Sequence, residues 1–155
     1  YFMPRAFFVE RLQKISQDDV QLQTLRKSGF NPLTASFVEH VLQDFEYSAE
    51  SEVEIVHWTP DKIEFQLDVS SKQFLVISEI FYPEGWKITS HPNWGIHPVN
   101  TILRGVYIPS GSHRMVMEFI PGDIFYGSIL TWGSTTVIIT LILSGIFIRR
   151  RNNAD

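Results

Sequence analysis

Three aromatic residues, Tyr82, Trp86 and Trp94, lie close together in a stretch that is rich in proline and glycine. The negative face of an aromatic ring packs well against the C–H groups of a sugar, and binding side chains concentrate on loops. This spacing predicts an aromatic platform that contacts a sugar or a glycolipid. The alternative is that Trp86 fills the core and Trp94 covers a loop, and burial of both indoles would exclude the platform.

Two charged residues stand in apolar segments on either side of these aromatics. Glu79 interrupts the run VISEIF, where a carboxylate must be paired, hydrogen-bonded or directed to solvent. It is a candidate for contact with a sugar hydroxyl. Arg104 is a candidate for contact with a lipid phosphate, because guanidinium binds phosphate through paired hydrogen bonds. The structural alternatives are an outward-facing Glu79 and an ion pair between Glu79 and Arg104.

The other residue types argue against several chemistries. The chain has no cysteine, which excludes thiolate catalysis and cysteine-based metal sites. Its five histidines lack the spacing of metal ligands, no Ser-His-Asp set can be argued, and the segment GSHR at Gly111 is typical of a hairpin turn. We therefore expect no metal, no cofactor and no catalytic residue. The net charge of −4 argues against nucleic acid as a partner.

The C-terminal segment has the pattern of a membrane span. No charged residue occurs from Ile124 to Ile148, and Arg149, Arg150 and Arg151 follow at once. A helix needs about 20 apolar residues to cross a bilayer. The arginine cluster predicts a stop-transfer signal with the C-terminus (149–155) in the cytoplasm. Residues before Asp123 are then expected outside the cytoplasmic membrane.

Small and weakly polar residues are frequent in this predicted span, and small residues let helices approach closely. They favour packing against other spans, although a lone anchor is the alternative. The chain begins with Tyr1 and shows no signal peptide of its own, so we expect a longer parent protein with upstream spans. The residues concerned are Gly127, Ser128, Thr131, Gly133, Ser134, Thr135, Thr136, Thr140, Ser144 and Gly145.

The residues before the span predict one domain that is mainly β. Apolar and polar residues alternate most clearly over 63–69, and short apolar segments separated by turn residues recur along 51–122. This recurrence is typical of a β-sandwich. Further strands are expected at 53–57, 74–81, 86–89, 101–108 and 114–120, with loops at 91–98 and 109–112.

The first 50 residues predict a short α/β segment of the same domain. Pro4 to Val9 suits a strand, and Ser16 to Ser28 suits a surface helix with Ser16 as its cap and Gly29 as its stop. Asn31 to Phe45 fits a helix by its apolar spacing, and a short strand through Phe37 is the competing interpretation.

The order of several segments resembles the C-terminal region of the bacterial YfhO-type membrane protein family. These segments are PRAFFV, FLVISEIFYPEGWK and NTILRGVYIPSGSHRMVMEF, followed by the span. The resemblance extends from Pro4 to about Ile148, and it rests on order and spacing because no single segment is specific. Two departures are Glu84, inserted between Pro83 and Gly85, and SHPNWG in place of the family's usual Val-Asp-Gly turn.

The resemblance implies a polytopic, glycosyltransferase-C-like protein of the bacterial cytoplasmic membrane that uses lipid-linked sugars to modify the cell envelope. The acidic residues expected to serve that chemistry lie in loops near the start of such proteins, outside this chain. This chain would then be an extracytoplasmic accessory domain and the last span. Its partners would be membrane lipid, upstream transmembrane helices, and a lipid-linked sugar or envelope polymer. The alternative function is a structural or protein-assembly module anchored in the membrane.

Overall fold

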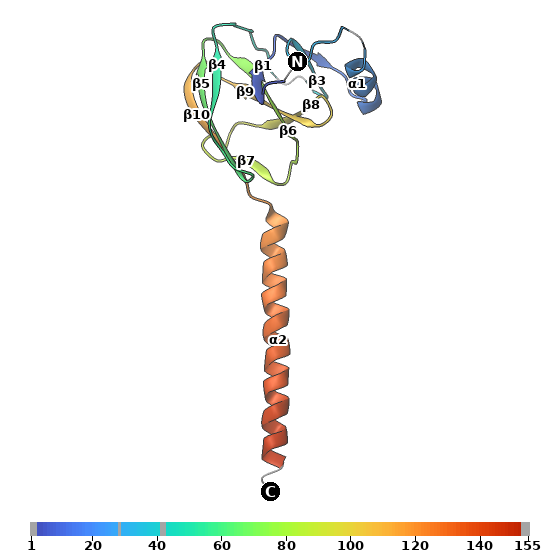
Figure 1. Ribbon diagram of the computed structural model, residues 1–155, viewed down its shortest axis with the longest axis vertical. Helices are drawn as coiled ribbons and strands as arrows, with labels where there is room; N and C mark the ends of the chain where they lie inside the picture. Colours follow the sequence, from blue (N-terminus) through green and yellow to red (C-terminus); the bar gives the residue numbers. More distant parts are fainter. Residues whose placement is uncertain (1–2, 28, 41–42, 153–155) are drawn as a thin grey trace. The chain divides into compact units, whose positions relative to one another are not determined.

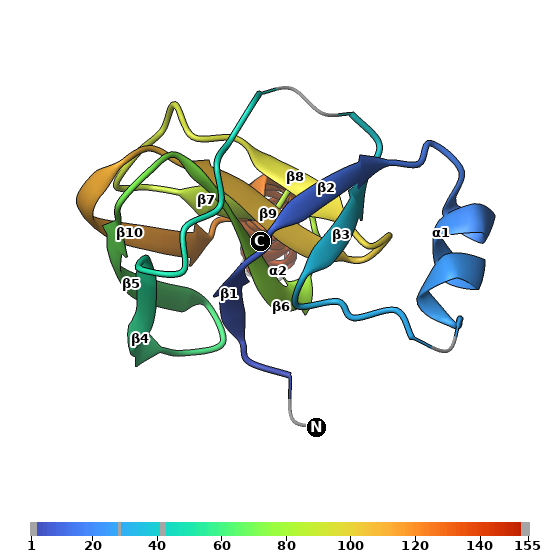
Figure 2. The same cartoon turned by 90° about the horizontal axis from the view of Figure 1, so that it is seen from above.

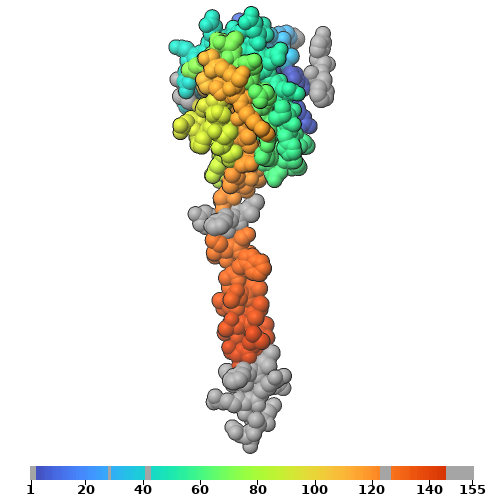
Figure 3. Space-filling view, turned by 90° about the vertical axis from the view of Figure 1, so that its left-hand side faces the viewer, coloured from blue at the N-terminus to red at the C-terminus, as the bar shows by residue number. Residues whose placement is uncertain are grey.

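The alternation of apolar and polar residues builds a four-stranded antiparallel sheet. The computed structural model describes residues 3–27, 29–40 and 43–152, without the side chains of 123–126 and 146–152. In β5, every second residue from Ile63 to Val69 is buried, because successive side chains of a strand point to opposite faces. Figure 3 shows β5 in green beside β10 in orange. The sheet order is β4 (Glu52–Trp58), β5 (Lys62–Val69), β10 (Gly111–Phe119) and β7 (Trp86–Ile88).

A six-stranded sheet forms the second layer (Figure 1). Its pairs are antiparallel except for β2 and β3, which run parallel. Strands from the first 50 residues thus supply half of this sheet. Its order is β1 (Ala6–Phe8), β6 (Gln73–Ile80), β9 (Leu103–Ile108), β8 (Ile96–Val99), β3 (Ala35–Val38) and β2 (Arg11–Lys14).

The two sheets share a hydrophobic core, which confirms the prediction of a mainly β, sandwich-like domain. Phe65 and Met115 from the four-stranded sheet pack in one cluster with Leu75 and Val106 from the six-stranded sheet. A second cluster lies on the other face of the six-stranded sheet, around Phe74, and Figure 2 shows both sheets from above. Residues Tyr1–Ile120 form one compact unit, called the β domain below.

In the N-terminal segment one prediction is wrong and one open alternative is decided. The helix α1 spans Asp18–Leu25, and its N-cap is Gln17, which makes no side-chain capping hydrogen bond. Ser16 as the cap is therefore wrong. The segment 31–45, for which helix and strand were both open, contains the strand β3, whose four residues are all buried. The buried amide of Phe37 is satisfied there because it donates to Asn100 Oδ1 at 2.8 Å.

Two predicted loops also need correction. Residues 91–98 were expected to be a loop, but β8 begins at Ile96 and pairs with β9. The segment after Pro109 is not a hairpin turn, since β10 begins at Gly111 and pairs with β5 and β7 of the other sheet. Gly111 has a φ of +121°, which lies in the region that favours glycine. This explains why a glycine stands where the chain crosses from one sheet to the other.

The C-terminal unit is the helix α2 (Gly122–Asn152), which confirms a C-terminal apolar helix. Its segment Gly127–Gly145 is long and apolar enough to cross a membrane. Hydroxyl groups here are satisfied within the helix: Thr131 donates to the Gly127 carbonyl at 2.9 Å, and Ser144 to the Thr140 carbonyl at 2.8 Å. Such internal bonds are what a lipid environment requires. The side chains of Arg149, Arg150 and Arg151 lie outside the described residues.

A charge cluster on the four-stranded sheet predicts a pH dependence of stability. Glu64 accepts a hydrogen bond from Arg114 and lies 2.9 Å from Lys62 Nζ. These contacts, that of Arg114 first, lower the pKa of Glu64 from 4.5 to about 2. Because the folded-state pKa is depressed, the stabilisation is complete above pH 4.5 and is lost as the pH falls towards 2.

The measurement is urea unfolding of the protein and of Glu64→Gln at a series of pH values. We expect the difference in free energy of unfolding to be largest near neutral pH and to shrink through the acid range. A difference that stays constant from neutral pH down to the pKa of Glu64 would contradict the ion-pair explanation. Glu54→Gln, an exposed change on the neighbouring strand β4, serves as the control.

Candidate functional site

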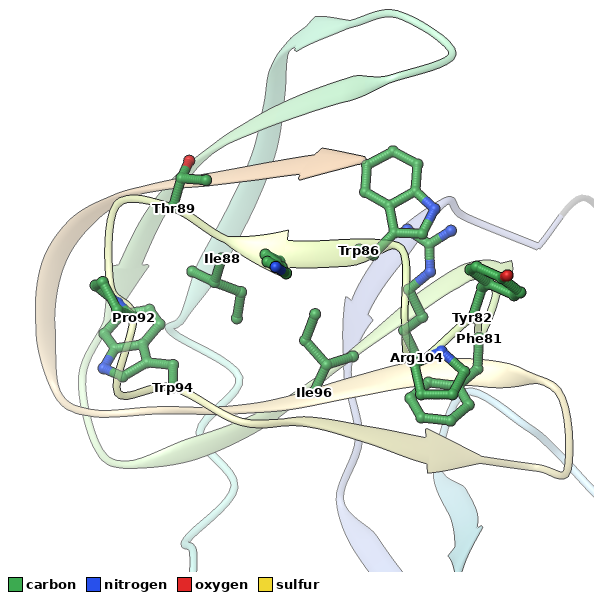
Figure 4. Close-up of a pocket in the computed structure, with 11 residues that line it drawn as sticks. Phe81, Tyr82, Trp86, Ile88, Thr89, Pro92, Trp94, Ile96 and Arg104 are labelled. Atoms are coloured by element: carbon green, nitrogen blue, oxygen red, sulfur yellow. The ribbon is translucent and has the colours of Figure 1, made fainter. Parts of the chain in front are cut away.

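A pocket of about 480 Å³ opens in the β domain beside β7 (Figure 4). All of its lining residues come from a single stretch, 81–104, that runs from the end of β6 through β7 and β8 into β9. The walls are mostly apolar. The lining residues are Phe81, Tyr82, Pro83, Trp86, Lys87, Ile88, Thr89, Pro92, Trp94, Ile96 and Arg104.

The aromatic end of the pocket is shaped by a tight turn after β6. The amides of Gly85 and Trp86 both donate to the Tyr82 carbonyl at 3.3 Å. A side chain at Gly85 would place its Cβ only 2.1 Å from the Phe119 ring, so the turn needs glycine for close approach. Phe119 in turn supports both Tyr82 and Trp86, with ring centroids 5.9 and 5.6 Å away.

Arg104 lies at this same end, beneath Trp86 (Figure 4). It follows the alternation of β9, in which Val106 and Ile108 also face the core between the sheets. Its guanidinium carbon lies 4.1 Å from the centroid of the Trp86 ring, a cation–π contact. Its Nε donates to the Ile80 carbonyl at 2.8 Å. Burial lowers the pKa of Arg104 to about 10, and the charge of Glu79 opposes this effect.

Trp94 and Pro92 form the opposite end, with Ile88 and Ile96 between the two ends (Figure 4). The Trp94 ring stacks on His91 with centroids 4.0 Å apart and also contacts His113 edge-on at 5.2 Å. Ser90 Oγ accepts from the Val116 amide at 2.9 Å and lies 2.8 Å from His91 Nδ1. Burial, and secondly the charge of His113, lower the pKa of His91. These contacts hold the indole of Trp94 in position at the rim.

Four of the predicted contact residues, Tyr82, Trp86, Trp94 and Arg104, meet in this pocket. Both Trp86 and Trp94 are partly buried against the core and partly accessible. The arrangement that would exclude a carbohydrate platform, burial of both indoles, is therefore not observed. However, Trp86 and Trp94 stand at opposite ends, so they do not form one continuous stacking surface.

Glu79 lies apart from the other predicted contacts. It is not among the residues that line the pocket, and its carboxylate lies 3.7 Å from Arg5 Nη1. In the part of the chain that the structure describes, Glu79 makes no ion pair with Arg104 within 4.0 Å. The structural alternative of a Glu79–Arg104 pair is thus replaced by an Arg5–Glu79 pair, which leaves the guanidinium of Arg104 without a contacting carboxylate.

Sequence reasoning missed several residues that shape the site. His91 and Phe119 support the tryptophans from behind, while Pro92 and Ile96 complete the wall. The one sequence signal for the strand β8 was that Ile96 follows a loop containing Pro and Gly. The prolines of this segment, however, argue against a strand, so the sequence favoured a loop there. Phe119 could not be found because its contacts depend on the pairing of β10 with β7.

The chemistry of the pocket favours binding of an elongated, partly apolar ligand with an anionic group. Its described lining includes two cationic residues, Lys87 and Arg104, and no carboxylate. Among the described residues, no group of three or more His, Cys, Asp or Glu side chains is placed to hold a metal ion. Comparisons of the chain with protein-family models, with curated proteins and with solved structures give no match.

Proposed function

We propose that this chain is the C-terminal extracytoplasmic accessory domain and last span of a polytopic envelope glycosylation protein of the YfhO type. In this proposal the β domain holds the carbohydrate part of a lipid-linked sugar or envelope polymer near the active site of the parent protein. Two observations support it most directly: the pocket that is lined by Tyr82, Trp86 and Trp94, and the presence in the same chain of a helix apolar enough to be a membrane span.

The shape of the pocket suits a sugar for a physical reason. Trp94 is held by His91 on one side, so its ring presents a rigid surface to the pocket at little entropic cost. Ile88 and Ile96 provide an apolar floor, while Thr89 adds a hydroxyl at the rim. A few polar groups in a mainly apolar concave wall are typical of small-molecule sites.

The expected result for this proposal is selective loss of glycan binding in Trp94→Ala. Loss of one stacking surface should weaken binding about tenfold. The measurement is calorimetric titration of the full chain, in a polyoxyethylene detergent free of sugar, with oligosaccharides and with a polyprenyl-phosphate hexose. Trp58→Ala is the matched control, because Trp58 is exposed, contacts Arg5 and lies outside the pocket.

A second candidate function is a structural or assembly module, and one observation favours it. Trp86 lies against both Arg104 and Phe119, so its ring contributes to packing whether or not a ligand binds. This hypothesis predicts that Trp86→Ala lowers the free energy of unfolding and that no saccharide binds to the unaltered chain. Absence of binding by every saccharide and glycolipid in the titration would favour this second function.

The proposed parent protein has its own test, which is recovery of the full open reading frame. Many upstream spans, with a pair of acidic residues in the first outer loop, would support a glycosyltransferase with this chain as its accessory part. A parent protein whose only span is α2 would lack the catalytic core, and the glycosylation proposal would then be abandoned.

A further inference from the structure

Four exposed apolar side chains lie at the end of the β domain where β6 and β10 finish. Two of them, Ile80 and Ile102, are 69% and 57% exposed and are the most exposed large apolar residues in the described part of the β domain. Single exposed apolar side chains are common, but a group of them marks an interaction surface. The group, called the apolar patch below, consists of Ile80, Tyr82, Ile102 and Ile120.

Backbone hydrogen bonds join the members of this patch. The amide of Phe81 donates to the Ile102 carbonyl at 2.6 Å, so the chain that follows β6 lies beside the tip of the β8–β9 hairpin. The amide of Ile120 donates to the Gly85 carbonyl at 2.6 Å. The amide of Gly85 in turn donates to the Tyr82 carbonyl at 3.3 Å. Segments from three parts of the chain therefore meet at this end of the β domain.

The tip of the β8–β9 hairpin presents Ile102 from a strained backbone. Asn100 and Thr101 have φ values of +49° and +73°, which are unfavourable for residues other than glycine. The amide of Asn100 donates to the Phe37 carbonyl at 2.8 Å. The hydroxyl of Thr101 donates to Gln21 Oε1 at 3.3 Å. An apolar side chain on a backbone that is fixed in this way loses little entropy when it contacts a partner.

The chain itself determines which surface lies close to the patch. Ile120 is a member of the patch and also the last residue of the β domain. Gly127, which begins the segment of α2 that is apolar enough to cross a membrane, follows seven residues later. Seven residues reach about 25 Å at most, even when they are fully extended. A bilayer that is crossed by α2 therefore always lies within this distance of Ile120.

The residue types at this end suit the interfacial layer of a bilayer. Tyrosine and tryptophan are enriched at that depth, and Tyr82 and Trp86 lie at the same end of the pocket (Figure 4). Glu84 and Lys87 are exposed in the adjoining turn and in β7. Because charged side chains are costly in hydrocarbon, they limit immersion to the boundary between headgroups and acyl chains, where interfacial elements bind.

We propose that the β domain binds the surface of the bilayer through the apolar patch, with Ile80 and Ile102 inserted at the boundary between headgroups and acyl chains. The inference rests on the span that the proposed function assigns to α2, and it adds a second membrane contact made by the β domain. Insertion removes exposed apolar surface from water, which is favourable. Because two contacts are joined by a short segment, the β domain is held in one orientation on the membrane.

Nitroxide labels test this contact on the full chain in phosphatidylcholine vesicles. The chain has no cysteine, so one introduced cysteine is the only labelling site. Ile80→Cys and Ile102→Cys place the label in the patch, and Val56→Cys, at an exposed residue of β4, is the matched control. We expect collisions with a water-soluble nickel chelate to be about tenfold rarer in the patch than at position 56, because removal of an apolar group from water favours the inserted state by about that factor. Collisions with oxygen, which concentrates in lipid, should be more frequent in the patch.

A substitution within the patch tests whether its apolar character makes the contact. Ile80→Glu should raise the rate of chelate collisions at a label on position 102 towards the rate at position 56, because a carboxylate is costly below the headgroups. Val56→Glu, which adds the same charge outside the patch, should leave the label at 102 shielded. Both residues are exposed, and thermal unfolding checks that each variant remains folded. Unchanged shielding in Ile80→Glu would show that the patch does not hold the domain on lipid.

A label at Val137→Cys, in the apolar segment of α2, separates failure of this inference from failure of the proposed function. If position 137 is shielded from the chelate while positions 80 and 102 are as accessible as position 56, the span stands and the patch contact is wrong. If position 137 is itself accessible to the chelate, α2 does not insert and the proposed span is wrong as well. Labels at 80 and 102 that are shielded from both chelate and oxygen, and that broaden as the ratio of protein to lipid rises, would identify a second copy of the chain on the patch and would also overturn the lipid contact.

Discussion

Replacing Phe65 with alanine is expected to lower the free energy of unfolding of the β domain by about 3 to 5 kcal/mol. Phe65 is fully buried at the middle of β5, and its register partners are Ile55 in β4 and Met115 in β10. Removal of the ring leaves a cavity at the centre of the core shared by both sheets. Strands on both sides of β5 hold the backbone in place, so little collapse can fill this space.

Urea unfolding followed by circular dichroism measures this effect. Gln66→Ala is a matched control, since Gln66 is the next residue of the same strand and points to solvent. Its change should remain within about 0.5 kcal/mol. A cost below about 1.5 kcal/mol for Phe65→Ala, the range of changes that leave core volume intact, would show that this core is not closely packed.

Gly105→Ala is expected to destabilise the β domain by about 2 to 3 kcal/mol, although it adds only a methyl group. An alanine Cβ would lie 2.2 Å from Cζ of Phe74 and 2.5 Å from Cγ2 of Val99. Neither side chain can withdraw, because both are fully buried. Phe74 is also held by Tyr107, whose ring centroid is 4.7 Å away.

A double substitution separates this overpacking from other causes. Phe74→Leu shortens the side chain that occupies the space above Gly105, so Gly105→Ala should cost clearly less in that background than in the unaltered chain. Gly95→Ala is the control, because its Cβ would meet only the edge of His97 at 3.3 Å. Equal costs of Gly105→Ala in both backgrounds would contradict the steric explanation.

The strands that sequence reasoning found are those with one buried face. β5 alternates because its odd-numbered residues from Ile63 enter the core while Gln66 and Asp68 face solvent. β3 could not be separated from a helix in this way, because its four residues are buried on both faces and carry no period of two. Its identity depends on β2 and β8, which flank it.

Non-local pairing was equally hidden from the sequence. Pro109 and Ser110 look like a hairpin turn because Pro and Ser favour turns, yet the strands they join belong to different sheets. The segment after Pro109 joins the four-stranded sheet because β10 pairs with β5 along eight register positions, from Gly111 to Glu118. No local property of residues 109–112 indicates that β5 is the partner of β10.

The residues of the candidate site could be predicted from their types and from their immediate neighbours in the sequence. Tyr82, Trp86 and Trp94 stand out by type, and Arg104 stands out as a charge in an apolar strand. Their meeting in one pocket, and the separation of Glu79 from it, depend on how β6, β7 and β9 are arranged. The bulge in the β6–β9 register between Ile77 and Ile80 lies beside Glu79, which accounts for its departure from the simple alternation.

The continuity of the pocket wall has a consequence for how such a domain can diverge. All lining residues belong to the stretch 81–104, whereas most residues of the core shared by the sheets lie in β5, β6, β9 and β10. The pocket wall and most of the shared core are therefore encoded in separate parts of the gene. Exchange of this one stretch, from Phe81 to Arg104, between related chains would replace the whole lining of the pocket in a single step and leave most of the core unchanged.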